Sequence, residues 1–178
     1  MTTLVEQVVA ISEALDTSGL EWAFGGALAL AYATNEPRGT RNIDVNVFVP
    51  SSQARSVVRS LPRGVRHTSA DIDAVTHNDQ VRLYWGDTPV DLFFAADGFD
   101  DDIARRTRRV PFAGRQIRVL CAEDLAVFKA MFDRPKDWVD IATMIDAGSL
   151  DVEVAASRLK RLLPGDDRVV RLRRSADL

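Results

Sequence analysis

The sequence predicts an α+β fold in which a mixed β-sheet is flanked by helices. Segments in which apolar and polar residues alternate, the period of a strand, occur before residue 120. After residue 121 the apolar residues recur at helical spacing. A doubly wound parallel sheet would instead need strands and helices to alternate throughout the chain. We therefore expect an α/β core over residues 1–120 and a helical C-terminal part over residues 121–178, packed on the same domain.

The composition sets limits on size and compartment. A chain of 178 residues, 46% hydrophobic and 28% charged, is long enough for one well-buried domain and short for two. Its net charge of −3 argues against unspecific, charge-driven coating of nucleic acid. The single cysteine excludes an internal disulfide framework, and no apolar run approaches the roughly 18 residues of a membrane span. We expect a soluble cytoplasmic protein without a membrane partner.

The first elements follow from spacing and turn signals. Apolar residues from Leu4 to Leu15 recur at helical spacing, Thr3 and Glu6 form a capping box, and Gly19 ends the predicted helix. The stretch "LEWAF" (20–24) favours a short strand because of its aromatic residues, and "GALALAYA" favours a helix that opens after it. The order strand, glycine turn, helix is expected here.

The next segments complete the sheet. Apolar residues alternate with polar ones over 43–49, which predicts a strand with one buried face, followed by a helix near 52–60. "QVRLYW" (80–85) and "PVDLFFA" (89–95) are separated by a loop of hairpin size, and a second pair, 108–112 and 115–120, turns at Ala113-Gly114. Apolar stripes over 122–133 and from 138 to 145 predict two helices.

Two features of these elements suggest chemistry. Gly25 and Gly26 lie where a strand turns into a helix, so backbone N–H groups and the helix N-terminus can approach a phosphate. Asp91 lies inside an apolar strand, where a carboxylate is costly to bury unless it binds a cation or accepts hydrogen bonds. Each feature also has a simpler interpretation, an ordinary turn and a structural Asp.

The ordered motifs resemble the nucleotidyltransferase superfamily, and within it the AbiEii-like group of bacterial toxin nucleotidyltransferases. The resemblance covers residues 24 to about 145 and rests on Gly25-Gly26, "RGTRNID", the Asp of "PVDLFF", and "AEDLAVFKAMFDRPKDWVDI". It implies a nucleotidyltransferase-like sheet and Mg²⁺-dependent transfer of a nucleoside monophosphate from an NTP to a hydroxyl of RNA, protein or a small molecule. It also implies tRNA or another RNA as one acceptor, a role as the toxin of a toxin–antitoxin pair, and an antitoxin protein as partner.

The resemblance assigns roles to particular residues. Asp44, Asp91 and Asn42 stand at the positions of the carboxylates that hold two Mg²⁺ ions, and Lys129 at that of a catalytic lysine which steadies phosphate charge. The nucleotide would be bound by the glycine turn and by four further residues, Arg38, Thr40, Lys136 and Asp137. Helical spacing also allows Lys129 to extend its stem along the core surface. Arg134, Lys136, Asp137 and Asp140 also fit a charge cluster at the start of a helix.

The sequence departs from the family at one metal position. The spacing from Arg38 and Thr40 places the first strand carboxylate on Asn42 and the second on Asp44, whereas a rival register uses Asp44 and Asn46. Residues 42, 44 and 46 share one strand face, so periodicity does not separate the registers. In either register an amide replaces a carboxylate, which weakens the expected affinity for Mg²⁺.

Two functional classes therefore remain open, with the enzyme favoured over a degenerate member that keeps the fold as a binding module. Two other charged stretches are expected to be structural. The acidic "DID" at 71–73 predicts a solvated loop, and the arginine-rich tail from 168 onward predicts a solvated end of the chain rather than an RNA contact.

Overall fold

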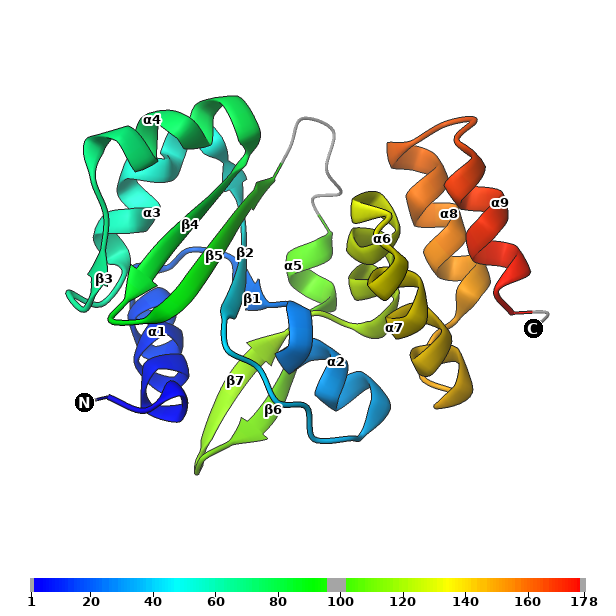
Figure 1. The fold of residues 1–178 in the computed structure, drawn as a ribbon, viewed down its shortest axis with the longest axis horizontal. Coiled ribbons are helices and arrows are strands. Elements are labelled where there is room, and N and C mark those ends of the chain that lie inside the picture. Colours follow the sequence, from blue (N-terminus) through cyan, green and yellow to red (C-terminus); the bar gives the residue numbers. More distant parts are fainter. Residues whose placement is uncertain (1, 96–101, 177–178) are drawn as a thin grey trace. The chain divides into compact units, whose positions relative to one another are not determined.

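The computed structural model describes residues 2–95 and 102–176. It confirms the α+β class: within these residues a seven-stranded mixed sheet is accompanied by helices (Figure 1). The strands are β1 Trp22–Phe24, β2 Ile43–Pro50, β3 Val65–Arg66, β4 Gln80–Trp85, β5 Thr88–Ala95, β6 Arg108–Phe112 and β7 Arg115–Val119. The helices are α1 Leu4–Ser18, α2 Gly26–Thr34, the 3₁₀ turn η1 Ser51–Gln53, α3 Ala54–Ser60, α4 Ser69–Asn78, α5 Ile103–Arg106, α6 Ala122–Phe132, α7 Pro135–Asp146, α8 Val152–Leu162 and α9 Asp167–Arg174.

The strand order is β3-β4-β5-β2-β1-β7-β6. β2 runs parallel to β5 and antiparallel to β1, so the strand that carries Asp44 lies in the middle of the sheet. Both predicted hairpins are present, as β4–β5 and β6–β7. A central strand has neighbours on both sides, and its polar side chains can therefore meet side chains of an adjacent strand.

The chain forms two compact units. The first comprises residues 1–28 and 39–119 and contains the whole sheet. Its apolar sheet face is built from alternate residues such as Val45, Leu83 and Leu92, all almost fully buried. Helices α1, α3 and α4 contribute Ile11, Val57 and other apolar side chains to the same core. The opposite face of β2, β4 and β5 carries the polar residues of those strands.

The second unit comprises residues 29–38 and 120–178 and is helical. Its core is formed by apolar side chains of α6, α7, α8 and α9, among them Leu125, Ile141, Leu159 and Leu172. Within the described residues of the chain, none of the helices combines the length and apolar character required to cross a bilayer.

Two expectations for charged stretches were wrong. Residues 71–73 lie inside α4, because Thr68 and Asp71 form a capping box that starts a helix where a loop was expected. The arginine-rich tail forms α9, in which Val169 and Leu172 are buried at helical spacing. In both cases a local helix signal outweighed the polar composition.

Candidate functional site

The glycine turn is built around the carboxylate of Asp44. The backbone N–H of Gly25 donates to the carbonyl oxygen of Asp44 at 3.0 Å, which joins the end of β1 to β2. Gly26 has a φ of +50°, and a Cβ at this position would overlap the Asp44 carboxylate. Both the backbone conformation and the close approach therefore require glycine at the first residue of α2.

The two carboxylates predicted as metal ligands lie side by side. Asp44 and Asp91 are register partners on the parallel strands β2 and β5, so their side chains leave the same face of the sheet. The Asn42 amide nitrogen donates to both Asp44 carboxylate oxygens and to Asp91 Oδ2, each at 3.1 Å. One amide group thus contacts both carboxylates, which converge beside Gly26.

Thr40 determines which end of the Asn42 amide faces the carboxylates. Its hydroxyl donates to the Asn42 carbonyl oxygen at 2.9 Å and to Asn42 Oδ1 at 3.1 Å. The Asn42 amide oxygen therefore points to Thr40 and the NH₂ group to the acids. Among the residues described, Asn42 has this contact with the carboxylates and Asn46, buried in β2, has none.

Arg82 is the second partner of Asp91. It is the cross-strand neighbour of Asp91 on β4 and donates from Nε at 2.7 Å and from Nη2 at 2.9 Å, a bidentate pair. The Arg82 side chain is 57% exposed and that of Asp91 only 9%. The hydrogen bond and charge of Asp91 raise the pKa of Arg82. Arg82 can rotate into solvent, whereas Asp91 cannot leave the sheet.

These residues suit one divalent cation better than two. Asp44 and Asp91 supply two carboxylates on one sheet face, and rotation of the Asn42 amide would add its oxygen, the hard donor type that Mg²⁺ prefers. No group of three or more acidic, His or Cys side chains suited to a metal occurs among the residues that the structure describes. The donor set therefore fits a metal ion but lacks the charge of a full two-metal site.

The second unit contains a separate ionic cluster around the predicted catalytic lysine. Lys129 Nζ lies 2.6 Å from Asp140 Oδ2 and 3.8 Å from Asp137 Oδ1. Arg38 Nη1 reaches the other Asp140 oxygen at 3.3 Å. Lys129 is nearly buried, so it does not merely extend along the core surface but ends in an ion pair.

Asp137 is held still more tightly. It is fully buried and accepts hydrogen bonds from Arg134 Nε at 2.6 Å, Nη2 at 3.1 Å and the backbone N–H at 3.2 Å. Burial raises the pKa of Asp137, but the hydrogen bonds and charge of Arg134, with the charge of Lys129, outweigh burial and leave it lowered. Asp137 is thus positioned to hold cations in place.

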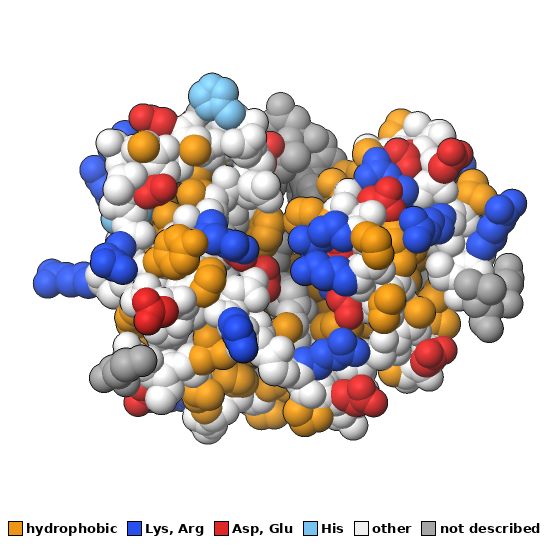
Figure 2. Space-filling view, viewed as in Figure 1, with side chains coloured by type: hydrophobic (Ala, Val, Ile, Leu, Met, Phe, Trp, Pro, Cys, Tyr) orange, Lys and Arg blue, Asp and Glu red, His pale blue; other side chains and the backbone are white. Residues whose placement is uncertain are grey.

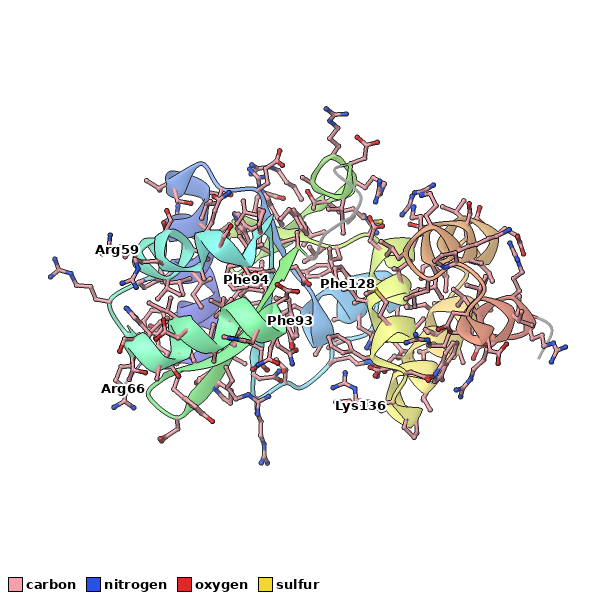
Figure 3. The ribbon with its side chains drawn as sticks, turned by 90° about the horizontal axis from the view of Figure 1, so that it is seen from above. Arg59, Arg66, Phe93, Phe94, Phe128 and Lys136 are labelled. Atoms are coloured by element: carbon pink, nitrogen blue, oxygen red, sulfur yellow. The ribbon has the colours of Figure 1, made fainter. Side chains whose placement is uncertain are left out.

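The predicted site residues therefore fall into two groups. The first unit brings together Gly25, Gly26 and Thr40 with Asp44 on β2, Asp91 on β5 and Asn42, which directly precedes β2. The second brings together Arg38, Lys129 and Asp137. Lys136 is exposed in the first turn of α7 and is labelled in Figure 3. Their roles in binding or catalysis remain predictions.

Sequence reasoning missed Arg82. It occupies a polar position of the predicted strand 80–85, but the register that places it opposite Asp91 joins two strands and is not encoded locally. The available signal was the alternation of polar and apolar residues in the hairpin strands 80–85 and 89–95. It places Arg82 and Asp91 each on the polar face of its strand. The sequence showed Arg134 and Asp140 as members of a charge cluster without revealing their partners.

The family of the chain follows from a comparison with models of protein families. A model of the family described as "Nucleotidyltransferase of unknown function (DUF6036)" matches residues 4–164. The chain belongs to this family. The match confirms a nucleotidyltransferase family, and the AbiEii-like group stays a prediction. A comparison with curated proteins found no match.

Solved structures of nucleotidyltransferases share the fold. A crystal structure of ANT(2")-Ia in complex with adenylyl-2"-tobramycin has a TM-score of 0.56 at 17% identity, and the match covers 99% of this chain and 98% of that one. The lincosamide antibiotic adenylyltransferase LnuA, lincomycin-bound, has a TM-score of 0.53 at 14% identity and covers 78% and 94%. An antigenic nucleotidyltransferase-like protein from Paracoccidioides brasiliensis has a TM-score of 0.54 at 15% identity and covers 95% and 92%.

The family match supports the enzyme hypothesis over the binding module. Family membership covers most of the chain, and the similar structures have the same α+β architecture along nearly their whole length. At these identities the structures establish the fold alone.

Proposed function

We propose that the chain is a Mg²⁺-dependent nucleotidyltransferase that transfers a nucleoside monophosphate from an NTP to an acceptor hydroxyl. The observation that carries this proposal is the pair of register-matched carboxylates, Asp44 and Asp91, beside the glycine that opens α2. Family membership supports the reaction class.

Asp44 and Asp91 would hold the cation, with Asn42 as a neutral ligand if its amide rotates. A divalent ion held there would supply positive charge to the triphosphate and to the reacting phosphorus. Because Asp91 is buried within the sheet, its carboxylate would hold the cation at a fixed position. Catalysis would then depend on positioning and on preorganised charge.

The glycine turn would receive the triphosphate. Without side chains at Gly25 and Gly26, the phosphates can approach the backbone at the start of α2, where N–H groups and the helix dipole favour an anion. Arg82 would leave Asp91 and follow the negative charge of the incoming phosphates, since its side chain is exposed and its stem is free to rotate.

For the second unit we propose, from the resemblance, that Lys129, Arg38 and Lys136 are phosphate-contacting residues. Arg38, Lys129 and Arg134 contact Asp137 and Asp140, so this ionic cluster carries an excess of positive charge. Lys136 lies exposed in the first turn of α7. Asp137 would act through Lys129 and Arg134 rather than by touching the nucleotide, because it is fully buried.

The acceptor remains the most open part of the proposal. RNA, including tRNA, a protein or a small molecule can each supply a hydroxyl, and we keep a toxin with an antitoxin partner in the cytoplasm as one biological setting. Two of the similar structures concern enzymes or complexes of antibiotics, which supports including small molecules among the acceptors to be tested.

A binding module is the second candidate. The observation in its favour is that Asn42 and Arg82 already provide hydrogen-bond partners for both carboxylates. Such a module would bind a nucleotide or a protein without turning it over.

The test measures transfer of a radioactive label from an NTP to an acceptor. The purified protein is incubated with each α-³²P-labelled NTP, Mg²⁺, and separate RNA, protein and small-molecule fractions of a cell lysate, with Asp44→Ala as the control. Label on one fraction that depends on Mg²⁺ and is lost in the variant supports the enzyme. Stabilisation by Mg²⁺ and NTP without label in any fraction would support the binding module.

A further inference from the structure

The polar sheet face continues from the carboxylates to the edge of the sheet. Arg82 pairs with Asp91 across β4 and β5, and Tyr84 lies two residues further along β4 on the same face. Tyr84 in turn is the register partner of Arg66 on β3. One face therefore presents, in order from the acidic pair, an arginine, a tyrosine and a second arginine.

The strip formed by Arg82, Tyr84 and Arg66 is open to solvent. Tyr84 is 46% exposed, although tyrosine is a large aromatic residue, and Arg66 and Arg82 are exposed as well. In Figure 2 hydrophobic and basic side chains lie next to each other over β4 and β5. Arg66, labelled in Figure 3, lies on β3, the edge strand of the sheet. The other apolar residues of β4, which are Val81, Leu83 and Trp85, alternate with Tyr84 and face the opposite side, so the sheet core does not require Tyr84 to be aromatic.

The strip ends in a hollow of about 820 Å³. Its lining includes Arg63, Arg66 and His67 together with Tyr84. Asp71 also lines it, but its carboxylate accepts from the backbone and hydroxyl of Thr68 at 2.7 and 2.8 Å and caps α4. Asp87, in the turn between β4 and β5, is the other acidic group of the lining. The charges of the two arginines and the two aspartates of this lining balance, but the Asp71 carboxylate is engaged in its helix cap, so Arg63 and Arg66 are the lining groups that can contact a phosphate beside the exposed ring.

We propose that this surface, formed by Arg63, Arg66, His67 and Tyr84, binds a single-stranded RNA that serves as the acceptor. Arginines bind phosphates, and an exposed aromatic ring stacks on unpaired bases, which is how single strands are bound without sequence preference. A cationic acceptor would be repelled by the same arginines. The inference rests on the proposed transferase function, since it gives that site its substrate class.

The position of the surface fits this role. Neighbouring strands lie about 4.8 Å apart and residues rise about 3.4 Å along a strand. Arg66 on β3 is two strands and two residues, roughly 12 Å, from the position of Asp91 on β5. One strand of RNA can therefore contact Tyr84 while its terminal hydroxyl reaches the carboxylates. The paired bases of a duplex would not be available to stack on Tyr84.

The experiment measures binding by fluorescence anisotropy of a labelled 12-nucleotide single-stranded RNA of mixed sequence. We expect Tyr84→Ala to weaken binding about 10-fold and Tyr84→Phe, which keeps the ring, to retain it. Arg66→Gln should weaken binding several-fold and lower the salt dependence by about one phosphate contact. The matched control is Arg115→Gln, an exposed arginine of the β6–β7 hairpin paired with Glu13, which should bind as wild type.

The outcomes separate this inference from the proposed function. Equal affinity of Tyr84→Ala and wild type, or equal binding of single-stranded and duplex RNA, overturns the surface assignment. If wild type transfers label to a protein or small molecule but binds no RNA, the transferase stands and the RNA surface fails. If RNA binds through Tyr84 but label appears only on another fraction, RNA is not the acceptor and this inference fails while the transferase stands. If no fraction is labelled with any NTP, the transferase function fails, although the surface still binds RNA.

Discussion

Two ionic clusters in this molecule use the same kinds of residue in opposite ways. In the first unit, Asp44 and Asp91 share the amide of Asn42, and Asp91 also pairs with Arg82. In the second unit, Asp137 and Asp140 contact one lysine and two arginines (Figure 2 shows basic side chains gathered over α6 and α7). The first cluster has an excess of negative charge and the second an excess of positive charge.

The clusters also differ in how firmly their partners are held. Arg82 is more than half exposed and can leave Asp91, whereas Lys129 is nearly buried between its two acids. A buried ion pair is expensive to break because each charge left alone has lost its water. In the first cluster Arg82 can therefore be replaced by another cation, whereas in the second cluster the ion pairs of Lys129 stabilise the fold.

The largest effect on activity is expected from a change in the first cluster, at Asp91. Asp91→Ala should lower the rate of nucleotide transfer by roughly 1,000-fold, because several kcal/mol of charge stabilisation would be lost. The variant should remain folded, since the exposed Arg82 can be hydrated once its partner is gone. The measurement is label transfer together with a thermal melt. A variant with wild-type activity would make Asp91 a structural residue.

The second cluster should respond in stability instead. Asp137→Asn removes the charge that Arg134 and Lys129 share and should lower the free energy of unfolding by about 3 kcal/mol. The pKa of Asp137 is lowered from its ordinary 3.8, so its contribution to stability is present above that value and is lost as the pH falls through the lowered pKa.

Urea unfolding at several pH values checks this expectation. Wild type should lose stability below about pH 4, in the window set by Asp137, and Asp137→Asn should lose less over the same range. Parallel pH curves for the two proteins would contradict the assigned role of Asp137. Asp73→Asn, a change of the same type in α4 of the first unit, serves as the control.

How far the sequence predicts these clusters follows from the range of each interaction. Strand alternation placed Asn42, Asp44 and Asp91 on polar faces, and the glycine turn was visible locally. The pairing of Arg82 with Asp91 depends on strand register, which arises from contacts distant in sequence. The burial of Asp137 likewise depends on packing within the second unit and leaves no local trace.

A smaller effect should follow from freeing Asp91. Arg82→Gln removes the internal cation that competes with a metal, so we expect affinity for Mg²⁺ or Mn²⁺ to rise about five-fold. Isothermal titration without nucleotide measures this directly, and Arg115→Gln is the matched exposed-arginine control. Weaker metal binding in Arg82→Gln would mean that Arg82 positions Asp91 for the metal instead of competing with it.

The central claim, that the carboxylate pair is a cation site with one charge missing, is tested most directly at Asn42. Asn42→Asp places a third carboxylate against Asp44 and Asp91, which should destabilise the metal-free protein through repulsion and stabilise it again with Mg²⁺. Asn46→Asp, two residues beyond Asp44 on β2, serves as the comparison.

The measurement is label transfer as a function of Mg²⁺ concentration for wild type, Asn42→Asp and Asn46→Asp. We predict that Asn42→Asp reaches half-maximal activity at a Mg²⁺ concentration several-fold lower than wild type, because a charged oxygen binds the ion more tightly than an amide. Asn46→Asp should leave the Mg²⁺ dependence unchanged. An unchanged Mg²⁺ dependence in Asn42→Asp, or activity that does not require Mg²⁺ in any of the three proteins, would contradict the account.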